Sequence, residues 1–419
     1  MSETHDKSSL TRRQFTKLGA TASFAMLARG AYAQTGGEKL KVGLLGCGSR
    51  GTGAAMNMLE GNENVEIAAL ADVFDDKIVS TRSTLEERAA GGIFKGSVNI
   101  ADDHCFVGLD AYTKILATDI DILIEGTLPY CRPTHVAAAI DAGKHVFTEK
   151  PISSEPAGVR VMIEASKKAQ EKKLSLVSGT QRRHDPGYIA NIEKIRNGDL
   201  GEIKALRVYW CGGLPFVHDR QEGWSDLEYC IRNWYAYCWV AGDNIVEQHI
   251  HNIDVGNWIM DGHPTSVYAS GGRTWKPLEP RYGDIWDHFD CDYEFDNGVH
   301  MFSMSRHWDG TDDGIFEQAW GTKGTFFSRT DVPPAEVSPY VQEHIDLVKS
   351  ITGEGPYLNE GVRVAESTLT AIMGRMSANT GRRIKWEEAL NADLNLVPAE
   401  LSFDKEYPLG PIPCPVQKN

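Results

Sequence analysis

The chain has 419 residues, of which 41% are apolar and 24% charged, enough for two packed domains. This balance excludes a disordered or fibrous protein. The formal net charge of −15 is spread along the chain, which argues against a surface for nucleic acid or anionic membrane.

The N-terminal segment has the features of an export signal. A pair of arginines with a following Phe and Lys stands in Thr11-Arg12-Arg13-Gln14-Phe15-Thr16-Lys17. The apolar stretch Leu18–Leu27 is too short and too rich in Ala and Gly for an anchor, and it leads to the small-x-small pattern Ala31-Tyr32-Ala33. We therefore expect residues 1–33 to be a twin-arginine signal peptide. The twin-arginine export machinery would then be a partner, and the protein would be exported folded and be periplasmic or secreted.

Residues 38–152 alternate short apolar runs with helical patterns. The first run is followed at once by glycines, and a later helical pattern over His135–Ala142 is closed by Gly143. The expected strands are Leu40–Leu45, Val65–Leu70, Ile120–Ile124 and His145–Thr148. Strands that alternate with helices predict an α/β Rossmann domain with a doubly wound parallel sheet.

The pattern changes after Pro151. Runs of alternating residues follow, and the turn signal Asp296-Asn297-Gly298 joins two of them. These runs are Ile203–Trp210, Thr265–Ser270, Phe289–Phe295, His300–Arg306 and Ile315–Trp320. The expected helices are 156–172, 186–197 and 362–380. Residues 153–400 are thus predicted to form an α+β domain for substrate binding and oligomerisation, with a large, mainly antiparallel open sheet, followed by a C-terminal tail at 401–419.

A glycine-rich turn follows the first expected strand. The run Gly46-Cys47-Gly48-Ser49-Arg50-Gly51 has the G-x-G-x-x-G pattern, in which the glycines allow a tight turn, a close approach of the backbone to a pyrophosphate and close helix packing. Asp72 ends the second strand 21 residues after Gly51, where an acidic side chain can bind an adenosine ribose. The expected cofactor contacts are Gly46, Gly48, Ser49, Arg50, Gly51 and Asp72. A carboxylate at this place repels a 2′-phosphate, so NAD is favoured over NADP, although Arg50 and Lys77 could reach a phosphate.

A second motif carries a family resemblance. The run Ala142-Gly143-Lys144-His145-Val146-Phe147-Thr148-Glu149-Lys150-Pro151 resembles the A-G-K-H-V-x-x-E-K-P motif of the Gfo/Idh/MocA oxidoreductases. The resemblance extends over the chain after the signal and includes the segments 181–186 and 242–264. Members are typically NAD(P)-dependent enzymes that act on sugars, inositols and related polyols, often as dimers or tetramers. The resemblance therefore implies a small-molecule sugar or glycoside substrate and a homo-oligomer.

The resemblance also implies roles for single residues. In the family the lysine of this motif sits near the nicotinamide and the reacting hydroxyl, which corresponds to Lys150. Glu149 would line the cofactor. Thr127 and Pro129 match a family loop at the nicotinamide half of the cofactor.

The family's second catalytic element is an Asp followed four residues later by His. Glu247 and His251 correspond to it here, and their spacing is expected to put both side chains on one helical face, which Asp254 extends. The imidazole would take the proton of the substrate hydroxyl. Glu in place of Asp, and the additional His249, leave open how Glu247, His251 and Lys150 divide the work. Since no third ligand accompanies the two histidines, no metal is predicted.

Aromatic and polar residues between these elements are candidates for substrate binding. The segment 224–239 combines aromatic rings with polar groups, as sugar sites do, although a hydrophobic core loop is an equally good interpretation. The candidate substrate contacts are Arg183, Tyr188, Arg232, Trp234, Tyr235 and His251.

Three functions remain open at this point. The first is an NAD-dependent oxidoreductase that oxidises a hydroxyl of a sugar, glycoside or polyol by hydride transfer. The second is a redox-neutral NAD-dependent glycoside hydrolase, which oxidises its substrate transiently, eliminates the aglycone and returns the hydride. An exported enzyme has little means to exchange free NADH, so a tightly bound cofactor would suit it. The third is a non-catalytic sugar-binding protein.

Overall fold

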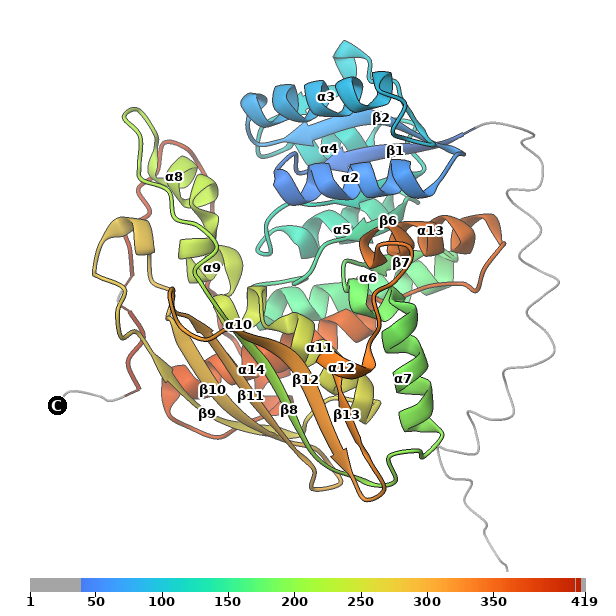
Figure 1. The fold of residues 1–419 in the computed structure, drawn as a ribbon. Coiled ribbons are helices and arrows are strands. Elements are labelled where there is room, and N and C mark those ends of the chain that lie inside the picture. Colours follow the sequence, from blue (N-terminus) through green and yellow to red (C-terminus); the bar gives the residue numbers. More distant parts are fainter. Residues whose placement is uncertain (1–38, 411, 416–419) are drawn as a thin grey trace, which may run out of the picture.

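A computed structural model describes residues 39–410 and 412–415 of the chain. The expected signal peptide at 1–33 and the last residues of the tail lie outside the described residues. Within the described part, no helix combines the length and the apolar character needed to cross a membrane. Figure 1 shows two sheets, one in each of two domains, with helices packed on them.

The N-terminal domain is built on a seven-stranded parallel sheet, as predicted. Its strand order is β3-β2-β1-β5-β6-β7, and β4 pairs with β2. The strands are β1 (Leu40–Leu45), β2 (Val65–Asp72), β3 (Ser97–Val98), β4 (Cys105–Val107), β5 (Ile122–Glu125), β6 (His145–Thr148) and β7 (Leu176–Ser178). The helices are α2 (Ser49–Gly61), α3 (Asp75–Ala90), α4 (Ala111–Leu116), α5 (Arg132–Asp141) and α6 (Pro156–Lys172), with a short 3₁₀ turn at Asp102–His104. The central strands are continuous apolar runs because helices cover both faces of the sheet.

The parallel sheet extends past residue 152, where we placed the end of the first domain. Helix α6 crosses over and leads to β7, which pairs in parallel with β6. A strand of only three residues gives too short an apolar run to be recognised in the sequence.

The second domain contains a seven-stranded mixed sheet in the order β13-β12-β8-β11-β10-β9-β14. Only β8 and β11 pair in parallel, so the sheet is mainly antiparallel, as predicted. Its strands are β8 (Ile203–Gly212), β9 (Ser266–Gly272), β10 (His288–Glu294), β11 (His300–His307), β12 (Gly314–Gly321), β13 (Thr325–Phe327) and β14 (Ile384–Lys385). Gly298 has a φ of +76° in the turn between β10 and β11, which explains the glycine there.

Helices pack on one face of this sheet. α11 (Ile250–Met260) contacts β8 and β12, and α14 (Gly361–Thr380) contacts β9, β10 and the crossover helix α6. The remaining helices are α7 (Pro186–Arg196), α8 (Asp226–Arg232), α9 (Cys238–Ala241), α10 (Asn244–Glu247), α12 (Ser328–Asp331), α13 (Pro339–Thr352) and α15 (Trp386–Leu390). Three 3₁₀ turns complete the domain, at Gln181–His184, Trp234–Ala236 and Pro280–Tyr282. The other face of the sheet exposes large aromatic side chains at Tyr268 and Phe302.

Helix α13 returns from the second domain to the first. It packs against α2, the helix that follows the glycine-rich turn, and α13 lies beside the N-terminal domain in Figure 1. Gly61 at the end of α2 has no room for a side chain, since a Cβ there would lie 2.8 Å from Ile345. The C-terminal part of the chain therefore helps to fix the helix that begins at the predicted cofactor turn.

Candidate functional site

The turn between β1 and α2 requires glycine at two positions. Gly46 has a φ of +96°, and a Cβ there would lie 2.6 Å from the backbone of Gly126 and of Thr127. A Cβ at Gly51 would meet the carbonyl oxygen of Gly46 at 1.9 Å. The absence of side chains thus lets the turn pack directly on the loop that follows β5. Gly48, by contrast, faces open space, which leaves its backbone accessible to a ligand.

Asp72 is hydrogen-bonded to this turn through its carboxylate. Its carboxylate accepts hydrogen bonds from the backbone N–H of Cys47 (2.6 Å) and of Phe74 (2.9 Å). Burial raises the pKa of Asp72, and the hydrogen bonds from the backbone act in the opposite direction. The end of β2 is therefore fixed to the glycine-rich turn, with a carboxylate where the fold would place an adenosine ribose.

Arg50, at the start of α2, connects this turn with the E-K-P motif through Glu149. Its Nε lies 2.9 Å from the Glu149 carboxylate, and its guanidinium lies over the ring of Tyr340 at 5.0 Å. Nε and Nη2 are buried and make no hydrogen bond within the described residues. These unsatisfied donors, the tight glycine turn and the open backbone at Gly48 fit an anionic dinucleotide.

A buried carboxylate stabilises the loop after β5. Glu125 accepts a hydrogen bond from the Thr127 hydroxyl and lies 3.2 Å from His135 Nδ1. Arg132 donates to the Thr127 carbonyl, and Pro129 is buried. Thr127 and Pro129, predicted to face the nicotinamide half of the cofactor, thus belong to a loop whose backbone is held in place.

Lys150 brings the two domains into contact. It follows β6 and precedes Pro151 across a cis peptide bond. Its ammonium donates to the Glu247 backbone carbonyl at 2.6 Å and to the Glu247 carboxylate at 2.9 Å. Both side chains are largely buried, with 10% and 8% exposed. A buried ammonium needs such partners, so the contact fixes the position of Lys150.

His251 lies close to this pair, at the start of α11. Burial and the positive charges of Lys150 and Arg182 hold the pKa of His251 well below 6.5. Its Nδ1 is buried without a hydrogen-bond partner among the described residues, and its ring stacks on Trp210 with centroids 5.8 Å apart. The site therefore contains a neutral imidazole with an unused hydrogen-bonding atom beside a lysine ammonium.

The spacing of Glu247 and His251 predicted one continuous helix, but the structure divides this segment into two helices. α10 ends at Glu247 and α11 begins at Ile250. The amides of Gln248 and His249 both bind the Asn244 carbonyl, and this wider turn separates the two helices. His249 points to the second sheet, where its Nε2 lies 2.7 Å from the Ser303 hydroxyl. Within the described residues, no group of three or more His, Cys, Asp or Glu side chains could hold a metal ion.

Arg183 and Tyr188 bind carboxylates of the second domain. Arg183 donates to both oxygens of Asp254 (2.8 and 3.0 Å), and its guanidinium lies 4.9 Å from the centre of the Trp258 ring. The Tyr188 hydroxyl donates to Glu317 at 2.9 Å. Neither residue contacts Lys150 or His251 through the polar groups described, so their substrate roles remain predictions.

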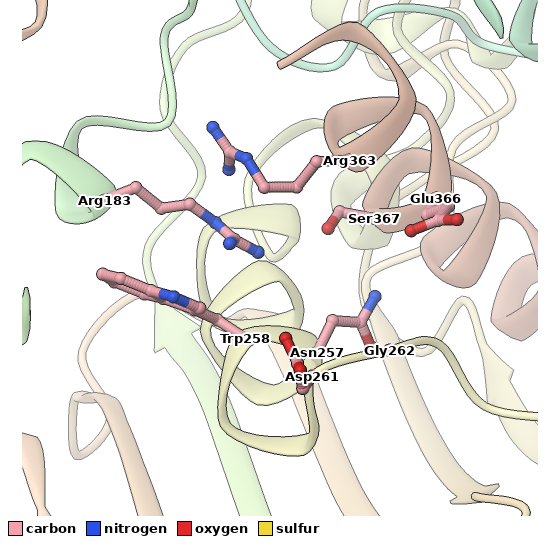
Figure 2. Close-up of a pocket in the computed structure, with 8 residues that line it drawn as sticks. All are labelled: Arg183, Asn257, Trp258, Asp261, Gly262, Arg363, Glu366 and Ser367. Atoms are coloured by element: carbon pink, nitrogen blue, oxygen red, sulfur yellow. The ribbon is translucent and has the colours of Figure 1, made fainter. Parts of the chain in front are cut away.

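Arg183 also lines a pocket of about 150 Å³ at the C-terminal half of α11 (Figure 2). The pocket is lined by Arg183, Asn257, Trp258, Asp261, Gly262, Arg363, Glu366 and Ser367. None of the predicted catalytic residues is part of this lining. This pocket is therefore a feature apart from the pair formed by Lys150 and Glu247.

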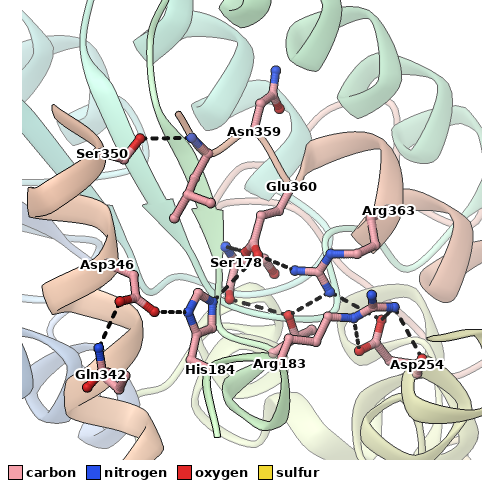
Figure 3. Close-up of polar contacts among 12 residues, drawn as sticks. Ser178, Arg183, His184, Asp254, Gln342, Asp346, Ser350, Asn359, Glu360 and Arg363 are labelled. Atoms are coloured by element: carbon pink, nitrogen blue, oxygen red, sulfur yellow. Dashed lines mark hydrogen bonds and ion pairs between the residues drawn. The ribbon is translucent and has the colours of Figure 1, made fainter. Parts of the chain in front are cut away.

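His184, next to Arg183, joins three segments that are remote in sequence (Figure 3). Its Nδ1 lies 2.7 Å from Asp346 on α13, and its Nε2 lies 3.5 Å from Glu360 at the start of α14. Burial alone would lower the pKa of His184, but the two carboxylates raise it to about 10. The imidazolium therefore ties the 3₁₀ turn at 181–184 to both C-terminal helices.

The aromatic segment contributes residues of different kinds. Tyr235 is buried in the core, and its hydroxyl lies 3.0 Å from His307 Nε2. Trp234 packs edge-on against Phe216, with ring centroids 5.6 Å apart. Arg232 binds Asp76 at the start of α3 in the first domain (2.8 and 3.1 Å). The structure thus separates these candidate substrate residues, and Arg232 lies beside the loop that follows β2 and Asp72.

Sequence reasoning missed three residues that act on predicted site residues. Arg182 binds Glu317 and its charge lowers the pKa of His251, Trp210 stacks on His251, and Tyr340 packs against the Arg50 guanidinium. The alternation of the strand at 203–210 indicated its ends but not which face would meet α11. Tyr340 lies on α13, for which we predicted no helix.

Sequence comparison now places this geometry in a family. Residues 40–176 match an oxidoreductase family with an NAD-binding Rossmann fold, and residues 190–327 match the GFO/IDH/MocA C-terminal domain. Together the two matches span more than half of the chain. The protein therefore belongs to the Gfo/Idh/MocA oxidoreductase family, and its N-terminal domain binds NAD.

Individual relatives are distant. The myo-inositol 2-dehydrogenase of Thermotoga maritima is 27% identical over 246 residues, which is 59% of this chain and 62% of the relative. The inositol 2-dehydrogenase of Cereibacter sphaeroides is 32% identical over 229 residues, 54% of this chain and 56% of the relative. The chain thus spans less than two thirds of the length of these curated relatives.

A solved structure shares the fold of both domains. The scyllo-inositol dehydrogenase of Lactobacillus casei, solved with bound NAD(H) and scyllo-inositol, superposes with a TM-score of 0.64. The match covers 84% of this chain and 100% of that chain, at 16% sequence identity. At this identity the similarity establishes the fold.

The role of Asp72 in cofactor binding can be tested by substitution. We expect Asp72→Ala to weaken NAD binding by about tenfold or more, because the ribose hydroxyls lose a charged acceptor. Isothermal titration calorimetry of the purified protein with NAD measures the change in affinity. Asp75→Ala, three residues further on, is the matched control and should bind like the wild type. Equal affinities of the Asp72→Ala variant and the wild type would contradict the assignment.

The ion pairs of His184 make a separate prediction about stability. Its pKa is about 10 in the folded protein and 6.5 when unperturbed, so its contribution to stability is complete below pH 6.5 and disappears as the pH rises toward 10. We expect His184→Gln to lower the free energy of unfolding by about 3 kcal/mol at pH 6. The difference in the free energy of unfolding between the variant and the wild type should become smaller when urea unfolding is repeated near pH 10. An equal difference at both pH values would show that the ion pairs are not its cause.

Proposed function

We propose that the protein is an NAD-dependent oxidoreductase that oxidises a hydroxyl group of a sugar, glycoside or polyol. The observation that carries this proposal is the contact between Lys150 of the NAD-binding domain and Glu247 of the second domain, with the unpartnered imidazole of His251 close by. An acid, a base and an orienting carboxylate thus converge at the carboxyl end of β6, where open α/β sheets bind their ligands.

The residues can divide the work of an alcohol oxidation as follows. Bound NAD would supply the acceptor for the hydride, the hydrogen together with its bonding electron pair, that leaves the substrate carbon. The neutral imidazole of His251 takes the proton of the hydroxyl, and the Lys150 ammonium stabilises the negative charge that develops on the oxygen. Glu247 holds Lys150 in position and balances its charge. The substrate leaves as a carbonyl compound.

A polyol or sugar is the substrate class that the surroundings favour. The Trp210 ring beside His251 offers an apolar face to C–H groups, while Lys150 and His251 bind hydroxyls. The inositol dehydrogenases among the relatives support a substrate of this kind.

Export and assembly are further parts of the proposal. The twin-arginine pattern within residues 1–33 favours export of the folded protein to the periplasm or the exterior. The aromatic side chains on the open face of the second sheet favour a homo-oligomer built through that face.

Removing the ammonium tests the central role of Lys150. We expect Lys150→Met to lower kcat/KM by about a hundredfold or more, because the developing alkoxide loses its positive partner. Lys168→Met is the matched control, since Lys168 forms an exposed ion pair with Asp141 on the surface. Circular dichroism and NAD titration show whether each variant is folded and loaded. Turnover of the Lys150→Met variant at the wild-type rate would contradict the proposed role.

The pH dependence of oxidation tests His251. Because its pKa lies well below 6.5, the imidazole is already neutral and able to accept a proton at pH 7. We therefore expect kcat/KM for oxidation to stay constant as the pH falls to 6.5, and to decline only at lower pH, where His251 becomes protonated. His251→Asn should remove this acid limb together with most of the activity. A decline that begins above pH 6.5 would assign the limb to another group.

A further inference from the structure

Two segments of the second domain reach the loop after β2, next to the predicted position of the NAD adenosine. One is the aromatic segment 224–240, which carries α8, and the other is the C-terminal segment 396–407. Figure 1 shows both beside the first domain, facing the carboxyl ends of its strands. Asp72 ends β2 at this edge, so the residues that follow it border the predicted ribose position.

Arg232 makes the contact between the two domains. Its guanidinium binds both oxygens of Asp76 (2.8 and 3.1 Å). Its central carbon lies over the Phe74 ring, 3.9 Å from the ring centroid. Phe74 is the residue whose N–H binds the Asp72 carboxylate. A second carboxylate, Glu228 on the same helix, holds the Arg232 Nε at 2.8 Å. The side chain of Arg232 is 17% exposed and that of Asp76 is 56% exposed, so the ion pair is shielded from water on the arginine side.

The C-terminal segment supports this contact from the other side. Phe403 packs against Phe74, with ring centroids 6.3 Å apart. The Tyr407 N–H donates to Asp226, the first residue of α8, at 2.9 Å, and its ring stacks on Trp239. The segment is anchored upstream, where the Leu396 N–H donates to Glu155 at 2.7 Å. It therefore holds α8 against the end of β2.

The same aromatic segment also binds the loop after β5, at the predicted position of the nicotinamide half. The Tyr130 N–H donates to the Val240 carbonyl at 3.2 Å, and the Tyr130 ring meets Trp239 edge-on at 5.1 Å. Segment 224–240 thus contacts the loop after β2 and the loop after β5. A dinucleotide that lies between these loops would be bridged by one continuous stretch of the second domain.

We propose that Arg232, Phe74 and Asp76 form an interdomain clasp that retains the adenosine half of NAD. Release of the nucleotide requires the guanidinium to leave Asp76 and Phe74, so the clasp slows dissociation and leaves the chemistry at Lys150 untouched. This gives Arg232 a part in holding the cofactor in place of the substrate contact suggested by its sequence neighbourhood. The proposal depends on NAD binding to the Rossmann domain and not on which hydroxyl is oxidised.

The rate of NAD release tests the clasp. The full-length mature protein is loaded with NADH, excess NAD is added, and the loss of bound NADH fluorescence gives the dissociation rate. We expect Arg232→Ala to release NADH about tenfold faster than the wild type, since an ion pair and a cation–π contact are both lost. Asp76→Asn should give a smaller increase, and the double variant should release no faster than Arg232→Ala, because both changes break the same contact.

Two controls separate the clasp from a general loosening of the protein. Arg196→Gln breaks an exposed Arg–Asp pair with Asp261, on the second domain, and should release NADH at the wild-type rate. Affinity for ADP-ribose should fall in Arg232→Ala, while affinity for nicotinamide mononucleotide should not change. Equal losses for both fragments would overturn the proposal, as would release from Arg232→Ala at the wild-type rate.

The variants also distinguish this proposal from the assignment of NAD binding. Asp76→Asn changes a side chain that is 56% exposed, so it keeps the test open if Arg232→Ala does not fold. A wild-type protein that binds no NAD would remove the basis of the proposal. A wild-type protein that binds NAD and releases it as fast as Asp76→Asn would refute the clasp alone.

Discussion

The buried contact between Lys150 and Glu247 is the interaction on which the rest of the site depends. It joins residues 97 positions apart, one at the end of a strand of the NAD-binding domain and one at the end of a short helix of the second domain. A lysine ammonium buried between two domains is tolerated only if it is neutralised and hydrogen-bonded. Glu247 provides both its carboxylate and its carbonyl, so the domain arrangement and the position of the ammonium are set together.

Burial and the charges around this contact together determine the protonation state of His251. Burial is the main cause of its lowered pKa, and the positive charges of Lys150, Arg182 and Arg50 lower the pKa further. Their own counter-ions are Glu247, Glu317 and Glu149, which are likewise buried. Each cationic group thus faces a carboxylate, while the imidazole stays neutral. This is the state that a base needs before it accepts the proton of an alcohol.

The sequence predicted the fold well because its patterns are local. The glycine turn, the continuous apolar strands and the alternating runs each reflect a short-range rule, and the structure contains the expected elements with shifts of a few residues at their ends. The three-residue strand β7 and the helix α13 were missed, since a short apolar run and a mixed amphipathic stretch give weak signals.

The site was predictable only in part. The family resemblance indicated Lys150, Glu247 and His251, because the matching motifs occupy one strand end and one helical segment. The partners of Arg232 and Arg183 could not be read from the sequence, since Asp76 and Asp254 lie 156 and 71 positions away from them. The break between α10 and α11 was also hidden, because both sides of it have helical patterns. Contacts of this kind depend on how the two domains meet.

The measurement that tests the account most directly is turnover of unlabelled substrates by the purified, NAD-loaded protein. A panel of polyols, free sugars and aryl glycosides is mixed with the protein, and the absorbance of reduced nicotinamide and the released aglycone are followed together. The account predicts that reduced nicotinamide accumulates with at least one polyol or free sugar. Release of aglycone without any net reduction would contradict it and identify a redox-neutral glycoside hydrolase.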